Sequence, residues 1–230
     1  MDDRENGPDN EQREDHGTIG RRSMLAKVGV GAVAGLAVSA PSLVAQTAPR
    51  QFEPARHSLD AWLDELAGNH RVFIDSSTTH GGANALRYAS NIITVHEDAY
   101  SGNAADLAMV VCFRHESTPY AFDDAIWAKY GAGFDPSAAT PPTANPMNTA
   151  TASNGGTSIG ALVAKGVQFA ICSRATRAFA GGLARRAGVP VDDVVKELMA
   201  GAIPNSRFVP AGVMTLTRAQ EYSYSLVYAE

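Results

Sequence analysis

Cys172 is the residue whose position best suits chemistry. It ends the apolar run 167–172, and a helical pattern starts directly after it at Arg174. A thiol at the N-terminus of a helix meets the helix dipole and unpaired backbone amides, which stabilise a thiolate, and Arg174 adds positive charge nearby. Cys172 is therefore a candidate nucleophile or sulfur acceptor. The competing interpretation is a small buried apolar residue, which is the commonest state of a free cysteine.

Polar residues also follow the other apolar runs of the chain. Arg114 and His115 come after the run 106–113, which is typical of a strand buried on both faces. In an open α/β sheet, ligands bind outside the carboxyl ends of the strands, so we expect these residues to share one edge with Cys172. Arg114 and His115 are candidate catalytic residues beside Cys172. For His115, pairing with Glu116 or the capped start of a helix competes with an acid–base role.

Four further residues are candidate ligand-binding groups for the same reason: His80, Ser173, Arg174 and Gly212. His80 lies in the polar segment that follows the run 71–75, where it could equally be a solvated loop residue. Gly212 belongs to a turn after the run 207–209. If the strands align as expected, two histidines (His80 and His115), an arginine (Arg114) and the Cys172 thiol lie at one edge of the sheet.

Cys112 lies inside an apolar run, between Val111 and Phe113, so it is predicted to be a packing residue. A bridge to Cys172 is compatible with the pattern if the two strands are neighbours, although two cysteines are too few for a disulfide scaffold. His80, His115 and Cys172 could form a metal site only through their shared edge, because the chain lacks the close-spaced ligand pairs of zinc sites. The sequence thus predicts neither a metal site nor a cofactor.

Two glycine-bearing segments invite a functional interpretation. Asn154-Gly155-Gly156 precedes a helical pattern and could cradle an anion, but it matches neither the dinucleotide nor the P-loop pattern. Gly181 and Gly182 fall inside a helical pattern, where they are predicted to allow close helix packing.

The elements that must position these residues alternate between strand and helix, which predicts a single α/β domain over residues 51–230. Its expected architecture is a mostly parallel five-stranded sheet flanked by helices in three layers. Between 131 and 156 the composition shifts to Pro, Thr and Asn, which predicts an irregular insertion that could act as a lid. The expected strands are 71–75, 106–113, 167–172, 207–209 and 222–228. The expected helices are 59–66, 83–97, 120–130, 157–165, 174–187, 191–199 and 213–221.

The first fifty residues lack the apolar periodicity of a packed core. Residues 1–20 are rich in acidic and small polar residues and are predicted to be a disordered acidic leader. Residues 21–50 resemble a twin-arginine (Tat) signal peptide and linker: Arg21-Arg22 precede Met24-Leu25, a lysine and a Gly/Ala-rich apolar stretch. This predicts export to the periplasm, with cleavage best placed after Ala45. The alternative is an uncleaved membrane anchor facing the periplasm, which the many glycines and alanines disfavour.

The charge balance excludes one class of partner. Without the five basic and seven acidic residues that precede Ala45, the chain keeps 14 basic and 17 acidic residues, a net charge near −3. Nucleic-acid binding normally requires a basic face, so no nucleic-acid partner is predicted.

Several of these motifs together resemble the DsrE/DsrF-like sulfur-relay superfamily over residues 71–228. The matching segments are Gly166–Cys172 with the helix after it, Phe208–Val213, and Arg218–Tyr224. A second similarity is to a branch with twin-arginine signals and the segment Arg-His-x-x-x-Pro-Tyr-Ala-Phe, here residues 114–122.

The resemblance also implies a fold, a function and an oligomeric state. It implies a DsrE-like three-layer fold in which Cys172 takes sulfur as a persulfide and passes it to a partner protein. It also implies assembly into homotrimers or hexamers. The alternative function is a non-catalytic periplasmic binding or assembly subunit that uses the same edge for a small anion, a metal or a partner protein. The sequence itself does not decide whether the protein is an enzyme.

Overall fold

The computed structural model describes residues 53–230, and the predicted leader and twin-arginine signal lie outside this range. The expected fold class is confirmed: five parallel strands form one sheet with helices on both faces. The strands are β1 (His70–Ser76), β2 (Leu107–Phe113), β3 (Gln168–Cys172), β4 (Ser206–Val209) and β5 (Ser225–Ala229). The α-helices are α1 (Trp62–Glu65), α2 (Thr79–Tyr100), α3 (Asp124–Phe134), α4 (Ile159–Ala164), α5 (Ser173–Ala187), α6 (Val191–Ala200) and α7 (Gly212–Glu221). The 3-10 helices are η1 (Ser58–Asp60), η2 (Ala104–Asp106), η3 (His115–Ala121) and η4 (Pro146–Asn148).

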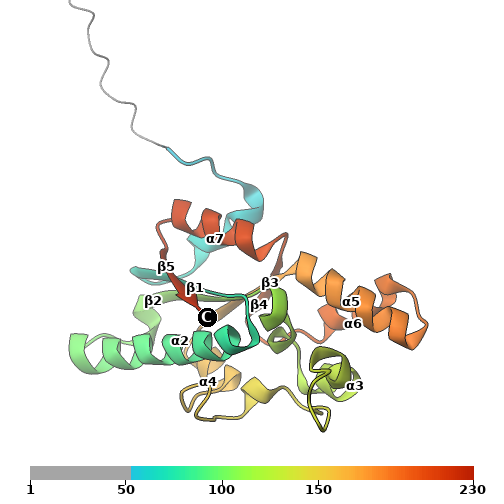
Figure 1. The fold of residues 1–230 in the computed structure, drawn as a ribbon. Coiled ribbons are helices and arrows are strands. Elements are labelled where there is room, and N and C mark those ends of the chain that lie inside the picture. The colour runs from blue at the N-terminus through green and yellow to red at the C-terminus, as the bar shows by residue number, and fades with distance from the viewer. Residues whose placement is uncertain (1–52) are drawn as a thin grey trace, which may run out of the picture. The chain divides into compact units, whose positions relative to one another are not determined.

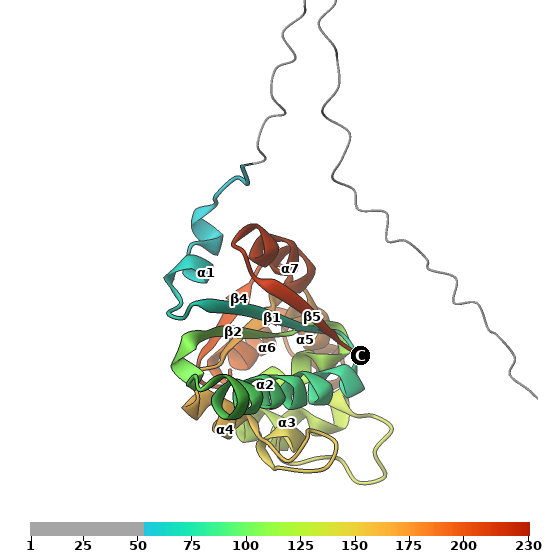
Figure 2. The same ribbon diagram turned by 90° about the vertical axis from the view of Figure 1, so that its left-hand side faces the viewer.

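The strand order β4-β3-β2-β1-β5 explains how the helices divide between the two faces. From β1 to β4 the chain moves across the sheet in one direction, and right-handed crossovers place the connecting helices α2 to α6 on a single face. The connection from β4 to β5 runs back in the opposite direction, so α7 lies on the other face. Figures 1 and 2 show α7 and the short α1 on one side of the sheet and α2, α3 and α4 on the other.

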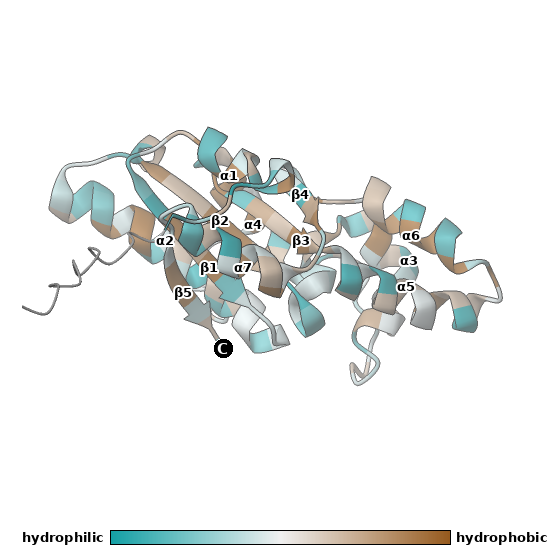
Figure 3. Cartoon of the chain, turned by 90° about the horizontal axis from the view of Figure 1, so that it is seen from above, coloured by the Kyte–Doolittle hydropathy of each residue, from teal (hydrophilic) through white to brown (hydrophobic). Residues whose placement is uncertain are grey.

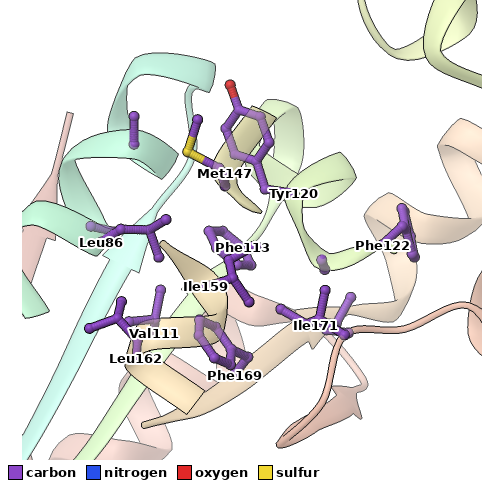
Figure 4. Packing of buried hydrophobic residues seen from close by; sticks show 14 of the residues in the cluster. Leu86, Val111, Phe113, Tyr120, Phe122, Met147, Ile159, Leu162, Phe169 and Ile171 are labelled. Atoms are coloured by element: carbon purple, nitrogen blue, oxygen red, sulfur yellow. The ribbon is translucent and has the colours of Figure 1, made fainter. Parts of the chain in front are cut away.

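β2 is the centre of the domain, and all seven of its residues are buried. Its side chains alternate between two apolar clusters, one on each face of the sheet. The larger cluster lies under α2 to α6 and includes Val111, Phe113, Phe169 and Ile171 (Figure 4). The smaller lies under α1 and α7. The strands are correspondingly apolar when the sheet is viewed from above (Figure 3). Among residues 53–230, no helix combines the length and the apolar composition needed to cross a bilayer.

Several element boundaries differ from the expected ones because side-chain caps decide them. The Thr78 side chain accepts a hydrogen bond from the Gly81 amide, so α2 begins at Thr79 and not at residue 83. Residues 115–121 form a 3-10 helix containing Pro119, and α3 begins only where Asp123 caps it by accepting from the Ile126 amide. In both cases a single side-chain hydrogen bond, and not the spacing of apolar residues, determines where the helix begins.

The predicted insertion 131–156 includes the last turn of α3, and its remainder packs through buried asparagines. The Asn145 side chain is buried, donates to the Tyr120 and Phe122 carbonyls at 2.8 and 2.7 Å, and accepts from the Met147 amide at 2.9 Å. These bonds attach the segment to η3, on the face of the sheet that carries α2 and α3. Ile171 belongs to the apolar cluster under α2 to α6. Successive side chains of a strand point to opposite faces, so Cys172 faces the α7 side. The idea that this segment covers the Cys172 site is therefore wrong.

Candidate functional site

A polar and sulfur-bearing row crosses the carboxyl ends of the strands on the α7 face. Parallel register places Tyr228 opposite Asp75, Asp75 opposite Cys112, and Cys112 opposite Ala170. Paired residues of neighbouring strands point to the same face. Cys172 is two positions beyond Ala170, so its side chain points to this face as well. The two cysteines therefore lie on the same face of adjacent strands.

Asp75 forms the centre of this row through an ion pair with Arg114. The Asp75 side chain is 0% exposed and accepts from Arg114 Nε at 2.8 Å and from Arg114 Nη2 at 2.7 Å. This bidentate geometry is the strongest form of an arginine–carboxylate contact. It raises the pKa of the Arg114 guanidinium. Arg114, predicted as a catalytic residue, therefore has its charge compensated within the fold.

Sequence reasoning did not select Asp75. The feature that could have identified it is its place in the strand: Asp75 is the sixth residue of the seven-residue β1, whose last four residues are buried. A buried carboxylate in such a strand requires a cationic or hydrogen-bonding partner, which identifies Asp75 as a structural or functional centre.

Cys112 is fully buried, as its position in an apolar run predicted. Burial, the Asp75 carboxylate and Cys172 together raise the pKa of the Cys112 thiol well above its ordinary value. Cys112 is thus a neutral thiol at physiological pH. Both cysteines are free thiols in the structure, so the Cys112–Cys172 bridge that the pattern allowed is not formed.

Cys172 lies where the sequence predicted, at the end of β3. It is the N-cap residue of the 15-residue helix α5, and it is 6% exposed. Its backbone carbonyl accepts from Thr176 Oγ1 at 3.0 Å, which anchors the first turn of α5 to the strand end. Cys172 therefore lies at the positive end of the α5 dipole, and its side chain makes no capping hydrogen bond.

Gly212 completes the same site as the first residue of α7. A Cβ added to Gly212 would lie 2.9 Å from Arg114 Cβ and 3.0 Å from Cys112 Sγ. The missing side chain lets the start of α7 lie directly on the thiol and the arginine. Gly212 is therefore a packing element of the site, and the ligand-binding role predicted for it stays a prediction.

The predicted residues His115, Ser173 and Arg174 are more exposed than Cys172 and Asp75. His115 is exposed, has a φ of 51°, and makes no ion pair with Glu116 among the described residues. With Ser77 and Thr78 it lines a surface depression of about 450 Å³. Ser173 is half-buried and Arg174 is exposed in the first turn of α5.

His80 does not lie in a loop as predicted. Because Thr78 caps α2, His80 is an exposed residue of the first turn of that helix. Within residues 53–230 no group of three or more His, Cys, Asp or Glu side chains could hold a metal ion. The hypothesis of a His80, His115 and Cys172 metal site is therefore wrong.

The glycine-rich segment at 154–156 does not present free amides to an anion. The Gly155 and Gly156 amides donate to the Ala152 and Thr151 carbonyls, at 3.3 and 2.8 Å. The Asn154 side chain is likewise used internally, since its Nδ2 donates to the Thr149 carbonyl. The segment is a turn whose polar groups form hydrogen bonds within residues 149–156.

Fold and site together define an α/β protein with one parallel sheet whose carboxyl edge carries two thiols and a buried Asp–Arg pair. No known protein-family model matches the chain, and no curated protein matches its sequence significantly.

Proposed function

We propose that this chain is an exported DsrE-like protein that accepts sulfur on Cys172 and relays it to a partner protein. The observation that carries the proposal is the position of Cys172 as the N-cap of α5 at the carboxyl edge of the sheet. A helix N-terminus places backbone amides and the positive end of a dipole beside the attacking residue, and the thiolate is the form of cysteine that attacks sulfur. Cys112 is unsuited to that role because burial raises its thiol pKa.

The proposed step is an exchange between sulfur atoms without net oxidation. The Cys172 thiolate attacks the terminal sulfur of a donor persulfide, the sulfur–sulfur bond of the donor breaks, and the donor leaves as a thiolate. Cys172 then carries the transferred sulfur as a persulfide. Attack by a thiolate of the partner on the terminal sulfur of this persulfide regenerates Cys172.

Arg114 and His115 have supporting roles in the proposal. The Asp75–Arg114 pair fixes the strand ends beside the thiols, so Arg114 acts as a positioning residue. His115 lines the depression with Ser77 and Thr78, and there it contacts the donor or the partner protein in this proposal. Homotrimeric or hexameric assembly and a periplasmic location, or a membrane anchor facing the periplasm, belong to the same proposal through the family resemblance and the segment 21–50.

The test is intact-mass measurement after incubation with a low-molecular-weight persulfide, for the wild-type chain and the Cys172→Ser and Cys112→Ser variants. We expect a reductant-sensitive gain of about 32 Da in the wild-type chain and in Cys112→Ser, and no gain in Cys172→Ser. An equal gain in Cys172→Ser, or none in the wild-type chain, would overturn the proposal. The mass of protein purified from the cell envelope also reports whether the signal is removed after Ala45.

A second candidate function is a non-catalytic binding or assembly subunit. The observation that favours it is the 6% exposure of Cys172, which restricts attack by a protein-bound donor. The rate of labelling by a small thiol reagent at mildly acidic pH separates the two functions. Faster labelling of Cys172 than of an unperturbed thiol of pKa about 8.5 supports the relay, whereas slow labelling supports the binding subunit.

A further inference from the structure

A second candidate site lies on the face of the sheet opposite the two thiols. It is a cavity of about 620 Å³ between the start of α2, η3, α3, the segment after α3, and α5. This volume is in the range of small-molecule sites in proteins. The cavity shares Glu116 and Phe179 with the depression that contains His115, so the two hollows are contiguous on the surface.

Aromatic side chains and prolines make up most of the lining. Tyr120 stacks on Trp127 with a centroid distance of 6.1 Å, Trp127 meets Phe134 edge-on at 5.1 Å, and Phe134 meets Phe179 edge-on at 5.9 Å. Trp127 Nε1 donates to the Pro119 carbonyl at 2.9 Å, which fixes the indole. The four rings form a continuous, preorganised aromatic chain along the cavity.

The charge of the lining is entirely negative. Glu116 and Asp135 contribute carboxylates, and no Lys, Arg or His side chain lines this cavity. Neither carboxylate forms an ion pair within residues 53–230. Asp135 is held in place because its Oδ1 accepts from Ser137 Oγ at 2.8 Å and from the Ala138 amide at 3.1 Å. An acidic cavity with aromatic walls is electrostatically complementary to a cation.

The Tyr120 hydroxyl supplies a hydrogen-bond donor to the cavity. Tyr120 is 6% exposed and lines the cavity, yet its hydroxyl has no hydrogen-bond partner among the described residues. The hydroxyl oxygen is not one of the buried polar atoms that lack a partner, so it is open to the solvent in the cavity. In Figure 4 the hydroxyl points away from the apolar cluster around Phe113. Burial, and then the nearby Asp135, raise the pKa of Tyr120 to about 12, so the hydroxyl keeps its proton and is a donor.

We propose that this cavity binds an organic cation, an alkylated ammonium compound that also carries a neutral hydrogen-bond acceptor. The ammonium group would lie against the aromatic rings beside Asp135 and Glu116, and the acceptor would receive the Tyr120 hydroxyl. A bare metal ion does not fit, because no group of three or more His, Cys, Asp or Glu side chains within residues 53–230 could hold one. An anion is excluded by the two carboxylates. This proposal does not rest on the proposed sulfur relay.

The test is isothermal titration of the full chain with choline and with 3,3-dimethyl-1-butanol, a neutral compound of the same shape. Trp127 fluorescence serves as a second readout. We expect saturable binding of choline and about tenfold weaker binding of the neutral compound, because one cation–π contact with a desolvated charge is worth about that factor. Equal affinity for the two compounds, or no saturable binding of choline, would overturn the proposal.

Matched variants locate the site. Asp135→Asn keeps the acceptor oxygen for Ser137 and removes the charge, so choline affinity should fall by about tenfold. Asp98→Asn removes the same charge from an exposed position of α2 and should leave affinity within about twofold. Phe179→Leu shortens the aromatic chain at its half-buried end and should also weaken binding. Unchanged affinity in Asp135→Asn contradicts the assignment, provided that circular dichroism shows a native fold.

Discussion

Asp75 and Arg114 join the ends of the neighbouring strands β1 and β2 through a bidentate ion pair whose carboxylate is completely buried. Removing one partner of such a pair leaves a buried charge without compensation. Arg114→Met should therefore lower the free energy of unfolding by about 3 to 5 kcal/mol, as measured by urea denaturation.

The control for this prediction is an exposed ion pair of similar length. Arg177 and Asp192 are 3.0 Å apart, with side chains 63% and 70% exposed. Arg177→Gln should change the free energy of unfolding by less than about 1 kcal/mol. Equal effects of the two substitutions would mean that Asp75 is solvated in solution.

Cys112 should make the stability of the protein depend on alkaline pH. Its thiol pKa is raised in the folded state, so the folded protein keeps this proton while the unfolded chain loses it above about pH 8.5. The stabilisation is complete below that pH and is lost as the pH rises toward the folded-state pKa. Between pH 8.5 and 9.5 the free energy of unfolding should fall by up to about 1.4 kcal/mol per pH unit from this group.

Urea denaturation of Cys112→Ala over the same pH range checks this effect. The variant starts from a lower stability because it loses a buried sulfur, but its alkaline slope should be shallower than that of the wild-type chain. Identical slopes would show that Cys112 ionises as easily in the folded protein as in the unfolded one.

Gly212→Ala should destabilise the protein at the thiol site. The added methyl group would lie 2.9 Å from Arg114 Cβ and 3.0 Å from Cys112 Sγ, so the start of α7 must move. We expect a loss of about 1 to 3 kcal/mol in the free energy of unfolding, measured by urea denaturation, together with faster labelling of Cys112 by a thiol reagent.

Gly181→Ala is the matched glycine substitution and should act in the opposite direction. The nearest atom to a Cβ at this position is Nη1 of the flexible Arg185 side chain, at 3.6 Å. The prediction that Gly181 and Gly182 allow close helix packing is therefore wrong. Alanine should stabilise α5 by about 0.5 to 1 kcal/mol, visible as a higher midpoint of thermal unfolding. A lower midpoint would indicate a contact of α5 that the monomer does not contain.

Asn145→Ala should release the segment that follows α3. The substitution leaves the Tyr120 and Phe122 carbonyls without their shared donor in a buried position. We expect a loss of about 2 to 3 kcal/mol in the free energy of unfolding. Relative to the wild-type chain, hydrogen exchange should accelerate more in residues 135–148 than in β2. Exchange that is unchanged in this segment would contradict the anchoring role of Asn145.

Local patterns were sufficient to predict the class of fold. Apolar runs alternate with helical periodicity along the chain, and this alternation requires a parallel sheet covered on both faces. The same patterns placed Cys172 at a strand end before a helix and Cys112 inside a strand. Helix starts were less predictable, because Thr78 and Asp123 decide them through single side-chain hydrogen bonds.

The sequence by itself determined the strands, the order of elements and the burial of Cys112, because these depend on the spacing of neighbouring residues. Only the tertiary structure decided that Asp75 neutralises Arg114, that Gly212 lies on the Cys112 sulfur, and that residues 131–156 pack on the face away from Cys172. The physical reason is that strand register and crossover handedness bring together residues that lie far apart along the chain. The aromatic and acidic cavity around Tyr120 is likewise assembled from α2, η3, α3 and α5, and no local pattern contains it.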